Sequence, residues 1–217
     1  MTLPPRARAA LGYVALYAAV GSGLSYLPLY YRSLGLAVGE IGGVLALGAF
    51  IGLAASPLWG SLSDRYRGSP LVFLGAVTTA IVGAAVLALA VDRAPLIVGA
   101  GVFGAGMAGV SPILDARALE TAGANRSGYG PLRAWGSVSY IISTLATGAA
   151  IEGSGIRALF LVLGPSLVAT GLIGLTLRPP TIRLETTVAP LRNAGRLFGR
   201  RGLGIFLLGT FLSWLGM

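Results

Sequence analysis

Residues 40–65, EIGGVLALGAFIGLAASPLWGSLSDR, show which kind of fold this chain forms. The segment is uncharged from Ile41 to Ser63, and charges return only at Asp64 and Arg65. About 20 apolar residues are enough for a helix to cross the hydrocarbon core of a bilayer. An uncharged run of this length therefore predicts a transmembrane helix.

Apolar segments of this kind recur along the chain. The composition is 55% hydrophobic and 11% charged, so there are too few charged side chains to cover a water-facing surface, and a soluble globular fold is excluded. Seven helices of about 20 residues would use about 140 residues and leave about 77 for loops and ends. The sequence predicts an all-α polytopic membrane protein with apolar segments at 9–31, 40–62, 70–91, 95–118, 131–151, 157–177 and 202–217.

The basic residues, all of them arginines, predict the orientation of the chain in the membrane. Of the 16, 13 lie before the first segment or in and around the connections after the second, fourth and sixth segments, and only Arg32, Arg93 and Arg157 lie on the other side. Cytoplasmic loops carry an excess of basic residues, so we expect a cytoplasmic N-terminus in the cell (inner) membrane. The same bias accounts for the net charge of +9, and no nucleic-acid partner is expected.

The longest connection between apolar segments divides the chain into three parts. Pro179 and Pro180 end the sixth helix. We therefore expect a six-helix bundle at 1–177, a central cytoplasmic loop at 178–201 and an incomplete seventh helix at 202–217, which is shorter than a full span. Within the loop, Arg192, Arg196 and Arg200 recur every four residues, which fits either an amphipathic helix on the anionic leaflet or a disordered basic tether.

Small residues and prolines indicate how the helices pack. Small residues at helical spacing allow helix backbones to approach closely in a membrane. These residues are Gly48 and Gly52 in the second segment and Ala100, Gly104 and Ala108 in the fourth. Pro57 and Pro112 lie inside apolar segments and predict kinks.

Two polar stripes mark a candidate binding site. One consists of Gly104, Ala108, Ser111 and Asp115, and the other of Arg133, Ser137, Tyr140, Thr144 and Thr147. Each stripe lies on one helix face, so neighbouring antiparallel helices would present a carboxylate and a guanidinium near their cytoplasmic ends. Arginine binds hydroxyls or carboxylates through its planar fork, and Tyr140 can stack on a ring. The candidate substrate-binding residues are Asp115, Arg133, Tyr140 and Ser137, and the alternative is a salt bridge that clamps a helical hairpin.

The end of the second segment resembles the major facilitator superfamily of transporters. Gly60, Asp64 and Arg65 match the superfamily's loop motif G-x-x-x-D-[RK]-x-G-[RK], but Arg67 occupies the place of the next glycine and Gly68 follows one residue late. The resemblance implies a gating loop in which Asp64 and Arg65 form a charge-linked contact that stabilises one access state. The alternative is a solvated turn that follows the positive-inside rule.

Residues 129–136, YGPLRAWG, are similar to the signature that opens helix five in the lactose permease group, which includes nucleoside and phenylpropionate permeases. Asp115 precedes Arg133 by 18 residues, the spacing of that group's sugar-contacting acid–arginine pair. The acid in that group is Glu, and a Trp stands where this chain has Tyr140. These two differences argue against lactose itself and leave the substrate class open.

The resemblance implies the first half of a twelve-helix secondary transporter in which two bundles rock about a midplane site. It further implies proton-coupled uptake of a small polar or aromatic solute. The group's coupling residues lie mainly in the missing C-terminal six-helix half, so we expect Asp115 to bind substrate rather than to carry the proton. The expected partners are the solute, protons, the lipid bilayer and that second half. The alternative is a non-transporting half-protein with a structural or pairing role.

Enzymatic function is not expected. The chain has no Cys and no His, which removes the commonest nucleophiles, general bases and zinc ligands. Its seven Asp and Glu residues lie mostly in separate loops. We therefore expect no catalytic residues, no cofactor and no metal site.

Overall fold

The computed structural model of the chain describes residues 3–66, 68–122, 128–177, 204 and 209. The chain divides into two compact units, Met1–Thr181 and Ile182–Met217, and all the long helices described below belong to the first. The expected central loop at 178–201 lies outside the described residues, as does the expected seventh helix at 202–217 apart from Gly204 and Gly209. The two alternatives for Arg192, Arg196 and Arg200 therefore stay predictions.

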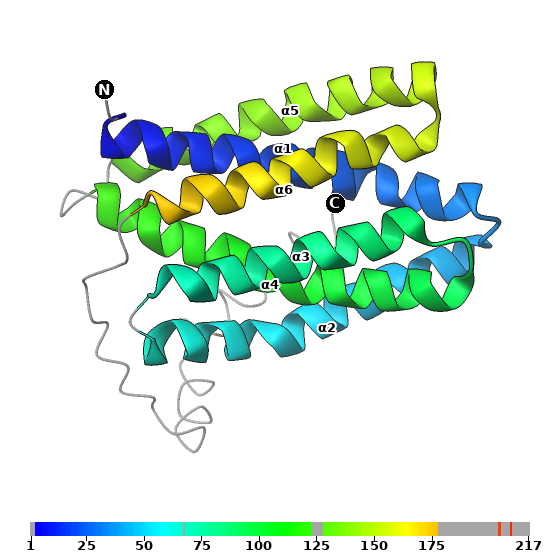
Figure 1. Cartoon of the computed structure of the whole chain (residues 1–217), viewed down its shortest axis with the longest axis horizontal. Coiled ribbons are helices and arrows are strands. Elements are labelled where there is room, and N and C mark those ends of the chain that lie inside the picture. Colours follow the sequence, from blue (N-terminus) through cyan, green and yellow to red (C-terminus); the bar gives the residue numbers. More distant parts are fainter. Residues whose placement is uncertain (1–2, 67, 123–127, 178–203, 205–208, 210–217) are drawn as a thin grey trace. The chain divides into compact units, whose positions relative to one another are not determined.

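Six long helices make up the described part of the first unit (Figure 1). Each corresponds to one predicted segment, and each is long and apolar enough to cross a membrane when α6 is taken with the short 3₁₀ turn η2 before it. The helices are α1 (Pro5–Ser33), α2 (Val38–Arg65), α3 (Pro70–Leu89), α4 (Arg93–Ala122), α5 (Tyr129–Ser154), η2 (Ile156–Ala158) and α6 (Leu159–Leu175). The prediction of an all-helical membrane fold is confirmed.

A tight turn joins α2 to α3. Gly68 has φ = +67° and its N–H donates to the Ser63 carbonyl at 2.7 Å, the arrangement in which a left-handed glycine ends a helix. Ser69 then caps α3 by accepting from the Leu71 N–H, and Pro70 stands in the first helical turn. The glycine that arrives one residue late relative to the superfamily motif is therefore the residue that reverses the chain.

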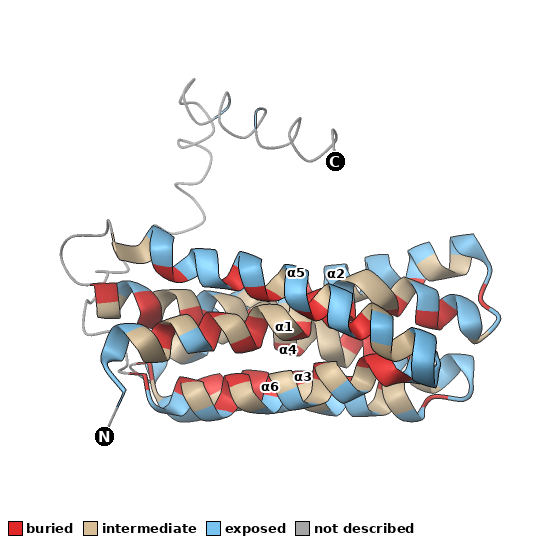
Figure 2. Ribbon diagram, turned by 90° about the horizontal axis from the view of Figure 1, so that it is seen from above, coloured by how far each residue is buried: buried red, intermediate tan, exposed pale blue. Residues whose placement is uncertain are grey.

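The helices pack with α3 against α4, α1 against α5, α2 against α4, and α6 against α1 and α3. One buried cluster includes Tyr30, Leu87 and Leu159, and a second, centred on other turns of the same helices, includes Tyr13 and Phe73. Many residues of α2 and α5 are exposed (Figure 2), and the exposed residues of these two helices include large apolar ones such as Phe50, Leu53, Ile141 and Leu145. Such surfaces are typical of helices in a lipid environment.

The glycines of α2 lie against the backbone of α4. A Cβ on Gly48 would lie 3.2 Å from the Ala100 carbonyl oxygen, and one on Gly52 would lie 3.1 Å from that of Gly104. The predicted close approach of these small residues is confirmed. Pro57 and Pro112 lie inside α2 and α4, and the kinks expected there stay predictions.

The helix ends that carry most arginines meet at one end of the bundle. Arg8 Nη1 donates to the Thr176 carbonyl at 2.7 Å, which joins the start of α1 to the end of α6. At the opposite end, Arg93 Nη1 lies 2.8 Å from Glu40 Oε1 and joins the starts of α4 and α2. Successive connections between helices therefore alternate between the two ends of the bundle, as the arginine pattern requires.

Candidate functional site

The structure brings Asp115 of α4 and Arg133 of α5 together. Arg133 Nη1 lies 3.2 Å from Asp115 Oδ1 and 3.4 Å from Oδ2. The Arg133 side chain is 47% exposed and that of Asp115 26%, so both charges remain accessible. The helix α4 continues to Ala122, beyond the predicted segment 95–118, so Asp115 lies about two turns inside its end.

Two tyrosine hydroxyls complete this pair. Tyr13 of α1 donates to Asp115 Oδ1 at 2.6 Å, and Tyr129 donates to the same oxygen at 3.0 Å. The Tyr129 oxygen also accepts from Arg133 Nη1 at 3.2 Å. Oδ1 is thus well satisfied, while Oδ2 has only the longer contact. All hydrogen bonds between this guanidinium and the described residues use Nη1, so its other N–H groups can bind a solute.

A third tyrosine lies against the guanidinium because α5 has a glycine beside it. The Arg133 Cζ lies 5.9 Å from the centroid of the Tyr17 ring, within the range of a cation–π contact. A Cβ on Gly136 would lie 2.7 Å from Tyr17 Cδ2, so a larger residue there would displace the ring. The second glycine of the YGPLRAWG segment therefore makes room for an aromatic side chain of α1.

The other predicted binding residues are arranged differently. The Tyr140 hydroxyl lies 3.2 Å from Ser25 Oγ of α1, and Thr144 Oγ1 donates to the Gly21 carbonyl at 3.3 Å, so this part of the stripe packs against α1. Ser137 is exposed. Among the described residues, no hydrogen bond connects Ser137 or Tyr140 to the acid–arginine pair, and their binding role stays a prediction.

The predicted gating residues lie at the exposed end of α2. Gly60, Asp64 and Arg65 are all exposed. Within the described ranges, neither the Asp64 nor the Arg65 side chain forms an ion pair or a hydrogen bond, so the gating role also stays a prediction.

Sequence reasoning missed Tyr13, Tyr17 and Arg117. Tyr13 and Tyr17 are spaced by four residues on α1, which is a weak signal because aromatic side chains are common on buried helix faces. The arginine pattern explains Arg117 only as a residue that sets topology, yet its guanidinium is buried and donates to the carbonyls of Gly174 and Gly68 at 2.6 and 3.1 Å.

Six helices that are long and apolar enough to cross a membrane define this chain as a polytopic membrane protein. A sequence model of the MFS_1 like family matches residues 7–188, and the chain belongs to this family. The family is one of transporters and not of enzymes, in agreement with the sequence-based expectation.

Known proteins of the same type resemble most of the chain. The maltose permease of Geobacillus stearothermophilus is 26% identical over 204 residues, which cover 93% of this chain and 51% of the permease. The crystal structure of the nucleoside transporter NupG matches with a TM-score of 0.75 at 16% identity, over 97% of this chain and 54% of that one. A variant of NupG matches with a TM-score of 0.74 at 17% identity, over 94% and 53%.

The chain thus spans about half the length of the relatives it matches. The structural likeness concerns the fold, and the described helices match the N-terminal half of the major facilitator fold. The predicted family and fold class are confirmed.

Proposed function

We propose that this protein belongs to a secondary active transporter that takes up a small polar or aromatic solute by alternating access, with protons as the coupling ion. The observation that carries the proposal is the accessible Asp115–Arg133 pair, surrounded by tyrosines inside a membrane bundle. Ionisable side chains are costly within membrane spans and mark the pathways of solutes and ions. Membership of a transporter family supports transport as the function.

The geometry of the pair suits an uncharged solute with hydroxyl groups. The two charges compensate each other, so the site attracts neither anions nor cations strongly. A solute hydroxyl can donate to Asp115 Oδ2 and accept from the N–H groups of Arg133 that bind no described residue. The ring of Tyr17 offers a face for stacking. Asp115 would act here as a carboxylate that binds the solute, and the coupling proton would be carried elsewhere.

A purely structural salt bridge is the competing interpretation. Accessible ion pairs contribute about 0–1 kcal/mol to stability, so a clamp of this kind would hold the α4–α5 hairpin only weakly. The exposure of both side chains therefore favours binding over clamping.

Solute binding is tested in the full-length protein. A thermal-shift screen of sugars, nucleosides and small aromatic acids first identifies a ligand. Asp115→Asn and Arg133→Ala should then abolish its binding while membrane expression stays unchanged. Glu40→Gln and Arg93→Ala remove an ion pair at the opposite end of the bundle and serve as matched controls with unchanged binding. Affinity at the level of the unmodified protein in both Asp115→Asn and Arg133→Ala would refute the site.

Proton coupling is tested in liposomes that contain the same protein and a pH-sensitive dye. Addition of the identified ligand should drive proton movement in the same direction as solute uptake. Solute uptake that leaves the internal pH unchanged, and that does not respond to an imposed pH gradient, would contradict proton coupling without affecting the binding site.

We also propose a cytoplasmic N-terminus, because the arginine-rich helix ends share one end of the bundle. The absence of Cys from the chain makes single-cysteine labelling direct. A membrane-impermeant maleimide added to intact cells should label Ser154→Cys, at the end of α5, and not Ser61→Cys, near the end of α2. The reverse pattern would overturn the orientation.

A further inference from the structure

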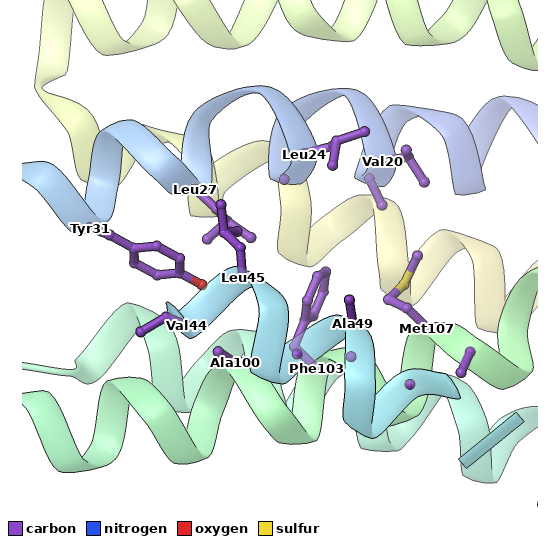
Figure 3. Close-up of a pocket in the computed structure, with 16 residues that line it drawn as sticks. Val20, Leu24, Leu27, Tyr31, Val44, Leu45, Ala49, Ala100, Phe103 and Met107 are labelled. Atoms are coloured by element: carbon purple, nitrogen blue, oxygen red, sulfur yellow. The ribbon is translucent and has the colours of Figure 1, made fainter. Parts of the chain in front are cut away.

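A cavity of about 350 Å³ lies between α1, α2 and α4, separate from the acid–arginine pair (Figure 3). Its walls are formed by apolar side chains, among them Leu24 and Leu27 from α1, Val44 from α2, and Phe103 and Met107 from α4. Gly48, Gly52 and Gly104 line it as well, and their lack of side chains leaves the space open. Tyr31 carries the only polar side chain among the 16 lining residues.

The hydroxyl of Tyr31 has no hydrogen-bond partner among the described residues. The side chain is only 2% exposed, and its oxygen points from α1 toward Val44 and Leu45 (Figure 3). Its oxygen borders the open space of the cavity, since it is not one of the fully buried polar atoms that lack a partner in the described part of the chain. A ligand that excludes water from the cavity must place a polar atom beside this hydroxyl, because a hydroxyl left buried without a partner costs about 1–3 kcal/mol. A purely hydrocarbon occupant such as a lipid chain supplies no such atom.

The size and the lining of the cavity define the ligand further. An apolar cavity of about 150 Å³ binds a benzene ring, so one of about 350 Å³ holds a bicyclic ring system. Phe103 and Tyr31 offer aromatic contacts, and Met107 offers a sulfur that packs well against rings.

The residues that line the cavity lie on the same faces of α1 and α4 as the residues of the acid–arginine site. On α1, Tyr13 and Tyr17 are followed at spacings of three or four residues by Val20, Leu24, Leu27 and Tyr31. On α4, Ala108 lines the cavity and precedes Asp115 by seven residues, which corresponds to about 10 Å along the helix. Tyr31 lies 14 residues beyond Tyr17, about 21 Å along α1, so a small solute bound at Asp115 does not reach it.

We propose that this cavity is a second binding site, which takes a small, uncharged aromatic molecule with one hydrogen-bonding substituent, and that Tyr31 pairs with that substituent. The site does not depend on the identity of the transported solute or on the Asp115–Arg133 pair, because its lining residues are different.

The test uses 2-naphthol as the probe and naphthalene as its apolar counterpart. Binding to the full-length protein in lipid nanodiscs is followed by probe fluorescence, with the signal of empty nanodiscs subtracted. We expect saturable binding of 2-naphthol, and Tyr31→Phe should weaken it about three- to tenfold, as the loss of one hydrogen bond predicts, while naphthalene binding stays unchanged.

A matched pair of variants tests the location. Ala49 lines the cavity, and Figure 3 shows it near Phe103 and Met107, whereas Ala46 is exposed on the same helix and is not among the lining residues. Ala49→Phe should fill the space and weaken 2-naphthol binding at least tenfold, and Ala46→Phe should leave it unchanged. Both positions are exposed, so both variants are expected to fold.

Three results would overturn the proposal. The first is the absence of saturable 2-naphthol binding, as expected if another part of the protein or a lipid fills the cavity. The second is equal binding by the Ala49→Phe and Ala46→Phe variants. The third is equal loss of 2-naphthol and naphthalene binding in Tyr31→Phe. Asp115→Asn should leave 2-naphthol binding intact, which keeps this outcome separate from that of the solute site.

Discussion

Replacement of Arg117 by Met tests how the arginine-rich end of the bundle is held together. The Arg117 side chain is 1% exposed. Its Nη1 donates to the Gly174 carbonyl of α6 at 2.6 Å, and its Nη2 donates to the carbonyls of Gly68 and Ser69 at 3.1 and 3.3 Å. Its Cζ lies 5.0 Å from the centroid of the Phe73 ring. One guanidinium therefore joins α4, the end of α6 and the turn that precedes α3.

The expected cost follows from these contacts. Met keeps much of the apolar stem but donates to none of the carbonyls. We count the two Nη2 contacts as one shared hydrogen bond, so two charge-assisted hydrogen bonds at about 1.5 kcal/mol each amount to about 3 kcal/mol. The variant also no longer has to bury a guanidinium, which costs free energy, so part of the free energy lost with the hydrogen bonds is recovered. We expect Arg117→Met to lower the free energy of unfolding by about 2 kcal/mol.

Unfolding in mixed micelles with increasing SDS, followed by tryptophan fluorescence, measures this change. The matched control is Arg93→Met, because Arg93 is 69% exposed and forms one ion pair, with Glu40. An exposed pair contributes about 0–1 kcal/mol, so the control should unfold close to the unmodified protein. If Arg117→Met unfolded at the same SDS fraction as Arg93→Met, the buried guanidinium would not hold these helix ends together, and the reasoning would be refuted.

Two further predictions concern the acid–arginine site. Gly136→Val should force the Tyr17 ring away from Arg133 and lower the free energy of unfolding by about 1–3 kcal/mol in the same SDS titration. The control is Gly130→Val, which should leave the free energy of unfolding unchanged because a Cβ at Gly130 meets no atom within 4 Å. Equal unfolding midpoints for the two variants would contradict the packing argument. Tyr13→Phe removes the 2.6 Å hydrogen bond to the Asp115 carboxylate. Thermal shift should then show binding of the identified solute weakened about three- to tenfold, at unchanged expression. An unchanged affinity would mean that Tyr13 does not position the carboxylate.

The spans could be predicted because the bilayer imposes a local rule. The apolar segment at 40–62 became Val38–Arg65, and the segment at 95–118 became Arg93–Ala122. Hydropathy locates the part of a helix that crosses the hydrocarbon core, but a helix continues past that part wherever its backbone groups remain paired. The ends therefore differ by a few residues, and in α4 the extension to Ala122 places Asp115 about two turns from the helix end.

The candidate site could be predicted only in part. Asp115 and Arg133 are visible in the sequence because charges are rare next to apolar runs. Tyr13 is not visible as a site residue, since its partner Asp115 lies 102 residues away and a tyrosine in an apolar helix is ordinary. Arg117 shows the opposite limitation, because the positive-inside rule accounts for any arginine near a helix end, whether it is exposed or buried.

The sequence by itself determined the membrane class, the positions of the described spans, the arginine asymmetry and the motifs of the family. Each of these follows from segment composition and short-range spacing, because apolar length decides whether a segment crosses a bilayer and residue spacing decides which side chains share a helix face. Only the tertiary structure decided which donors converge on Asp115, why Gly136 must be small, and where the cavity beside Tyr31 lies. These features depend on contacts between helices far apart in the chain, and such contacts are set by the packing of the whole bundle.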